Sequence, residues 1–154
     1  MNVINPSLDL VLERVVDVPA DKIFQCWTHE EHLPHFFVPK PWTLASCKVD
    51  PRPGGAFESV MRSPDGQEFP NKGCFLVVET HRIVFTSALE AGYRPAKEGF
   101  FTCELTLVPE GNGTRYKAVA MHATEENKAK HEAMGFHKGW GIVLDQLVEY
   151  AKGL

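Results

Sequence analysis

Residues 43–122 alternate between apolar and polar side chains with the period of two that a β-strand requires. In one expected strand Phe57, Ser59 and Met61 share a face, while Glu58 lies on the other. Turn sequences separate the expected strands at residues 50–55, 64–66 and 110–113. The pattern predicts an antiparallel sheet in this region, built from six strands, with one dry face and one wet face.

The dry face needs an apolar partner, and the C-terminal segment supplies one. Thr124 is a good N-cap, so a long helix is expected to begin there. Apolar side chains recur at steps of three and four along this helix, at Phe136, Trp140, Leu144, Leu147 and Ala151. The glycines in this segment either let the helix approach the sheet or a ligand, or mark a break near Gly135.

The N-terminal part completes the predicted architecture. Residues 8–18 predict an opening strand that ends at Pro19, and a short helix follows from Asp21. A second short helix is expected over residues 29–37. The predicted fold class is therefore α+β, with a curved antiparallel sheet wrapped around a long C-terminal helix. A length of 154 residues fits a single domain over residues 1–154.

Charge and cysteine content exclude several classes of function. The chain has 16 Lys and Arg against 20 Asp and Glu, and no basic run, so nucleic acid is not an expected partner. No apolar stretch approaches the roughly 18 residues of a membrane span, and no basic leader opens the chain. The evenly spread cysteines are interpreted as reduced thiols at positions 26, 47, 74 and 103. These features predict a soluble cytoplasmic protein.

The histidines do not predict a metal centre. His29, His32 and His35 repeat every three residues, which carries them around a helix and favours a surface cluster. His131 and His137 lack the spacing of a zinc-binding H-E-x-x-H helix. No metal and no cofactor are expected.

Four motifs occur in an order that resembles the START-like helix-grip superfamily, also called SRPBCC. They are the strand-to-helix junction at residues 18–24, the proline and glycine turn at 49–55, the Gly-Cys-Phe sequence at 73–75 and the run at 131–140. Within the superfamily the chain is similar to the C-terminal domain of activators of the heat-shock protein 90 ATPase. The resemblance implies a helix-grip fold with an apolar cavity between the sheet and the long helix. Members bind hydrophobic small molecules, a minority catalyse cyclisation or hydrolysis, and some bind chaperones.

The predicted ligand-binding residues combine this cavity with the dry faces of the expected elements. The apolar candidates are Trp27, Phe36, Phe37, Trp42, Phe57, Met61, Phe75, Phe85, Phe101, Cys103, Phe136, Trp140 and Leu144. The polar candidates are Ser59, Ser87 and His122. Ordinary core packing explains many of the aromatic residues equally well, and each hydroxyl is equally suited to a neighbouring backbone group.

His122 and Tyr116 are the candidate catalytic residues. His122 follows the last expected strand and is placed on its inward face, where an imidazole could bind a polar ligand group or move a proton. The competing interpretation is a histidine that caps the following helix or bonds to a backbone carbonyl. No serine lies in a G-x-S-x-G motif, so serine hydrolase chemistry is not supported.

Three hypotheses about function follow. The leading one is a protein that binds a small apolar molecule in an internal cavity. The second is an enzyme of the polyketide cyclase or hydrolase type that uses His122 and Tyr116. The third is a chaperone-interaction module. A homodimer formed through a sheet edge or through residues 90–97 is a further candidate interaction.

Overall fold

The computed structural model describes residues 3–154, and its largest element is a five-stranded antiparallel sheet. The strand order is β1-β10-β9-β6-β5, so the first and last strands of the chain are neighbours. The strands are β1 (Asp9–Val16), β5 (Cys74–Glu79), β6 (Arg82–Thr86), β9 (Thr102–Glu110) and β10 (Gly113–Met121). The inward face of β9 carries Cys103, Leu105 and Leu107, all fully buried, which agrees with the predicted dry face.

A second, smaller sheet is formed by three strands. It has the order β2-β3-β4, with β2 (Thr43–Val49), β3 (Phe57–Arg62) and β4 (Glu68–Asn71). A short ribbon pairs β7 (Leu89–Glu90) with β8 (Arg94–Pro95). Residues 43–122 thus form nine strands in three sheets instead of six strands in one.

A tight turn within the small sheet lies against the edge strand β5 of the large sheet, because Gly54 and Gly55 exchange backbone hydrogen bonds with Phe75. The predicted turn at residues 50–55 joins β2 to β3, and the backbone folds back on itself there. A Cβ atom at Gly55 would lie 2.0 Å from the carbonyl oxygen of Asp50, so only glycine fits. An isolated bridge between Ala56 and Cys74 then links the small sheet to the edge of the large one.

The predicted second short helix is wrong in extent. Helix α1 (Ala20–Thr28) follows β1 as expected, but only a 3₁₀ turn, η1 (Leu33–His35), forms within residues 29–37. Pro34 lies in the middle of that segment, where it removes a backbone donor and prevents a regular α-helix. A second 3₁₀ turn, η2 (Ala91–Tyr93), lies between β7 and β8.

The C-terminal segment consists of two helices, α2 (Glu125–Ala133) and α3 (Phe136–Lys152). The predicted cap is confirmed, because the Thr124 side chain accepts a hydrogen bond of 3.0 Å from the backbone N–H of Asn127. Gly135 separates the helices with a φ of +93°, a conformation that glycine adopts without strain. The single long helix is therefore interrupted, and the alternative of a break near Gly135 is confirmed.

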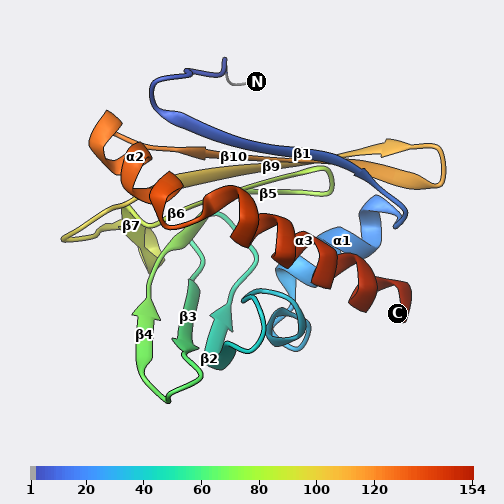
Figure 1. The fold of residues 1–154 in the computed structure, drawn as a ribbon, viewed down its shortest axis with the longest axis horizontal. Helices are drawn as coiled ribbons and strands as arrows, with labels where there is room; N and C mark the ends of the chain where they lie inside the picture. Colours follow the sequence, from blue (N-terminus) through green and yellow to red (C-terminus); the bar gives the residue numbers. More distant parts are fainter. Residues whose placement is uncertain (1–2) are drawn as a thin grey trace.

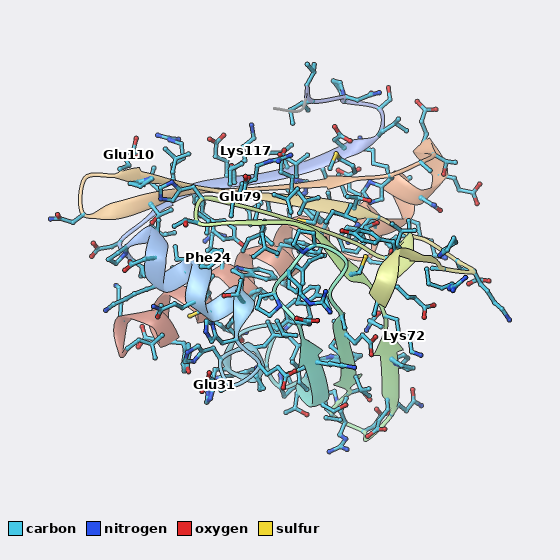
Figure 2. All side chains as sticks on the ribbon, turned by 180° about the vertical axis from the view of Figure 1, so that it is seen from behind. Phe24, Glu31, Lys72, Glu79, Glu110 and Lys117 are labelled. Carbon is cyan, nitrogen blue, oxygen red and sulfur yellow. The ribbon has the colours of Figure 1, made fainter. Side chains whose placement is uncertain are left out.

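Helix α3 crosses the inner face of the large sheet (Figure 1), with α1 beside its C-terminal half. Leu144, Leu147 and Ala151 of α3 are buried in one apolar cluster with Leu105 and Ala118 of the sheet. Figure 2 shows the labelled charged side chains of Lys117 and Glu110 at the opposite side of the sheet. The predicted α+β helix-grip fold is confirmed. Within residues 3–154 no helix is long and apolar enough to cross a membrane.

Candidate functional site

A pocket of about 380 Å³ lies where the break between α2 and α3 faces α1 and the small sheet. Its size falls within the range of roughly 300–1,000 Å³ that is typical of small-molecule sites. The lining consists of Trp27, Phe37, Val38, Pro39, Trp42, Met61, Phe85, Phe101, His131, Met134, Gly135, Phe136, Gly139, Trp140 and Val143. The wall is overwhelmingly apolar, and His131 is the ionisable side chain in it.

Eight of the predicted ligand-binding residues line this pocket. They are Trp27, Phe37, Trp42, Met61, Phe85, Phe101, Phe136 and Trp140. All three tryptophans of the chain are among them. Residues that are far apart in the sequence meet here because α1, the segment after η1, β3, β6 and α3 all face the same space.

Other predicted apolar residues lie behind the wall and do not reach the pocket. They are Phe36, Phe57, Phe75, Cys103 and Leu144, all part of the main apolar cluster. The Phe57 ring packs 4.7 Å from that of Phe85 and 5.6 Å from that of Phe37, so it supports two lining residues from outside. Ordinary core packing therefore accounts for the positions of these five side chains.

The two predicted serines also lie outside the pocket lining. Ser87 Oγ accepts hydrogen bonds from the backbone N–H groups of Phe100 and Phe101, at 2.9 and 3.1 Å. Ser87 thus provides an acceptor for two backbone N–H groups, which is the alternative to ligand binding that the sequence indicates for each hydroxyl. Ser59 borders a different hollow of about 140 Å³, which it shares with Cys47 and other residues of the small sheet.

Tyr116 is fully buried in the core and is not part of the pocket lining. Burial raises the pKa of its hydroxyl far above the usual value, so the group remains protonated. The indole nitrogen of Trp27 is also buried, and it has no hydrogen-bond partner among the described residues. The geometry brings neither polar atom to the pocket.

His122 is buried as predicted, and both of its ring nitrogens are engaged. Nδ1 lies 2.8 Å from the carbonyl oxygen of Leu8, and Nε2 lies 2.8 Å from Nδ1 of His131. A hydrogen bond to a backbone carbonyl is an alternative to a functional role that the sequence indicates, and His122 makes such a bond. His122 itself is not among the lining residues, but its partner His131 is.

His131 is the polar site residue that sequence reasoning missed. It lies on α2 with 7% of its surface exposed, and its ring packs 4.9 Å from that of Phe101 and 5.2 Å from that of Phe136. Burial, together with the neighbouring His122, lowers the pKa of His131 to about 4. The sequence contains a usable signal, because one histidine follows the last strand and another lies on the helix that comes next.

The segment after η1 forms one wall of the pocket and is held by a side chain of α3. Gln146 Nε2 donates to the carbonyl oxygens of Phe36 and Val38, at 3.0 and 2.9 Å. Gln146 Oε1 accepts from the backbone N–H of Lys40 at 3.0 Å. These three bonds fix the backbone that carries Phe37, Val38 and Pro39.

The histidines near η1 are occupied with one another and with the end of α3. His32 Nδ1 lies 2.6 Å from the hydroxyl of Tyr150, and the ring of His35 stacks on that of Tyr150 at 4.4 Å. Across residues 3–154, no group of three or more His, Cys, Asp or Glu side chains is arranged to hold a metal ion.

The family described as Activator of Hsp90 ATPase homolog 1-like protein matches residues 17–152. The chain belongs to this family. The matched AHSA1 region extends from the end of β1 to the last residue of α3, so it contains every residue that lines the pocket. The predicted resemblance to the activator branch of the START-like superfamily is thereby confirmed.

Several solved structures share the fold. Protein NE0264 of Nitrosomonas europaea is 47% identical, with a TM-score of 0.94 and 97% of each chain covered. An AHSA1-like protein of Aeromonas hydrophila is 19% identical, with a TM-score of 0.72 over 95% of this chain and 93% of that one. The AHSA1 protein of Silicibacter pomeroyi is 21% identical, with a TM-score of 0.68 over 92% and 95%. No curated protein matches the chain significantly.

Proposed function

We propose that this AHSA1 domain binds a small apolar molecule in the pocket at the break between α2 and α3. The observation that carries the proposal is the lining, in which tryptophan, phenylalanine, methionine and valine side chains surround about 380 Å³. Burying apolar ligand surface against such a wall is favourable by roughly 25 cal/mol per Å². The apolar lining supports the proposal of an apolar ligand, with eight of the predicted ligand-binding residues in the wall.

The proposal is tested with N-phenyl-1-naphthylamine, a fluorescent apolar probe. Because all three tryptophans line the pocket, a bound probe accepts their excitation energy. We expect saturable energy transfer with one probe per chain. Native mass spectrometry of freshly purified protein then reports any molecule that copurifies and the number of chains per particle, which also tests the predicted homodimer.

A blocking variant makes the test specific. A Cβ atom at Gly139 meets nothing within 4 Å, and Gly139 lines the pocket, so we expect the side chain of Gly139→Leu to occupy pocket space. We expect this variant to weaken probe binding by about tenfold or more, which corresponds to about 1.4 kcal/mol. Lys138→Leu adds the same side chain at the exposed neighbouring position and is the matched control. The absence of saturable transfer, or equal affinity in the parent and Gly139→Leu, would refute the proposal.

Contact with a chaperone is a second candidate function, favoured by the family description alone. A pull-down with purified heat-shock protein 90 tests it independently of the probe, and we expect the blocking variant Gly139→Leu to leave such contact intact.

The alternative that the protein is a cyclase or hydrolase has less support, because His122 and Tyr116 both lie outside the pocket lining.

A further inference from the structure

The histidine pair gives the pocket a defined polar character. The carbonyl oxygen of Leu8 can only accept a hydrogen bond, so Nδ1 of His122 must carry the hydrogen. In a neutral imidazole the other nitrogen is then an acceptor, and Nε2 of His122 must receive its bond from a hydrogen on Nδ1 of His131. When both rings are neutral, one backbone carbonyl thus determines the tautomers of both.

The same chain of bonds determines what His131 offers to a ligand. With its hydrogen on Nδ1, neutral His131 has a lone pair on Nε2. No described residue bonds to this nitrogen. The Nδ1 edge faces His122, which is outside the lining, so Nε2 is the nitrogen available to the pocket.

The surroundings of the pair keep His131 in this state. The rings of Phe100, Phe101 and Phe136 pack at 4.9–5.2 Å from that of His131. In this apolar environment the pKa of His131 is lowered to about 4, so the ring is uncharged at neutral pH. A neutral acceptor attracts a hydrogen-bond donor and gives no favourable contact to a carboxylate.

We propose that the pocket selects apolar, preferably aromatic, molecules that carry a hydroxyl or N–H donor, which bonds to Nε2 of His131. The inference rests on the proposed function and names the class of ligand for the same site. His122 is a positioning residue, since it acts through the tautomer of His131. An apolar molecule that ends in an anionic group is disfavoured.

The test uses three naphthalene probes of similar size in isothermal titration calorimetry at pH 7.5. 2-Naphthol has a donor, 2-methoxynaphthalene is more apolar but has none, and 2-naphthoate is an anion. One neutral hydrogen bond corresponds to about 3- to 10-fold in affinity. We expect 2-naphthol to bind tighter than the ether by this factor, against the trend that hydrophobicity alone would produce, and 2-naphthoate to bind most weakly.

Two matched variants assign the preference to one ring. His131→Phe keeps an aromatic ring and removes the acceptor, so the preference for 2-naphthol over the ether should disappear while the ether still binds. His137→Phe makes the same change at an exposed position of α3 that is not in the lining, and the preference should persist.

The outcomes separate the two proposals. If no naphthalene probe and no N-phenyl-1-naphthylamine binds, the proposed function fails, and this inference fails with it. If the probes bind but 2-naphthol and the ether have equal affinity, or if the preference survives in His131→Phe, only the inference about the ligand class is overturned.

Discussion

His131 combines burial with an ionisable neighbour, and both oppose its protonation. Its pKa is about 4 in the folded protein and about 6.5 in an unfolded chain. Between these values the unfolded state binds more protons, so stability is complete above about pH 6.5 and falls as the pH is lowered toward 4. We expect this group to contribute a loss of roughly 2 kcal/mol in the free energy of unfolding, measured by urea denaturation across that range.

The variant His131→Phe provides the comparison, because it cannot take up the proton. The free energy of unfolding of the parent minus that of His131→Phe should decrease steadily from pH 7 to pH 4.5, since only the parent carries the histidine. A constant difference across this range would show that His131 does not titrate as its burial predicts.

The roles of single residues were predictable from the sequence where they depend only on neighbouring residues in the chain. The cap at Thr124 and the inward direction of His122 follow from sequence neighbours alone. The role of His131 was not predictable by the spacing test, which asks only whether two histidines share a metal. Its partner comes from another element, nine residues away, and the Leu8 carbonyl that orients the pair is more distant still.

At the scale of elements, two glycines of α3 occupy different environments. A Cβ atom at Gly139 has open space, whereas one at Gly141 would lie 2.5 Å from Nη2 of Arg14. Arg14 also bonds to Asp145 at 2.8 Å. Gly139→Ala should therefore raise the free energy of unfolding by up to about 1 kcal/mol, through helix propensity. Gly141→Ala should raise the free energy of unfolding less, because the Arg14 side chain has to move to make room for the new methyl group. Equal increases for the two variants in urea denaturation would contradict this prediction.

The three bonds of Gln146 make a second prediction about α3. Gln146→Leu leaves two carbonyls and one N–H of residues 36–40 without their partner, so the free energy of unfolding should fall by about 1–3 kcal/mol. Amide exchange at Lys40 should also become faster. Glu149→Leu, at an exposed position of the same helix, is the control and should change both quantities little.

The positions of strands and turns were predicted well where they depend on a short stretch of sequence. The turns at 50–55, 64–66 and 110–113 all join consecutive strands, as their proline and glycine content indicates. The division into separate sheets was not predictable, because the period of two shows which face is buried and not which strand is the neighbour. The strand β5, for example, pairs with β6 and bridges to Ala56 instead of continuing the sheet of β3.

At the scale of the whole molecule, one apolar cluster connects the sheets and helices. Val49 and Phe57 of the small sheet belong to the same cluster as Leu105 of the large sheet and Leu144 of α3. We therefore expect a single cooperative transition in urea, with tryptophan fluorescence and far-ultraviolet circular dichroism giving the same midpoint. Two separated midpoints would show that the small sheet unfolds on its own.

The whole fold was predictable because the order of motifs is specific to the helix-grip architecture. The site was predictable only in part, since an inward aromatic residue on the dry face is equally suited to a core or to a pocket. Trp140 lines the pocket, whereas Leu144, one turn further along the same stripe, is buried against the sheet. Trp140 lies close to the break at Gly135, which itself lines the pocket, whereas Leu144 lies further along α3 and packs in the main apolar cluster.

The pairing of β1 with β10 governs the order in which the newly made chain can fold. Asp9 pairs with Met121 and Val16 with Thr114, so a stretch of about 100 residues separates the partners. At a synthesis rate of about 5–20 residues per second, β1 leaves the ribosome roughly 5–20 s before its partner exists. During that interval Leu10 and Val11 are exposed in a strand whose backbone has no neighbour, which is the condition under which strands associate wrongly. The large sheet is therefore completed only after β10 has been made, and α3, which follows β10 in the chain, then covers it.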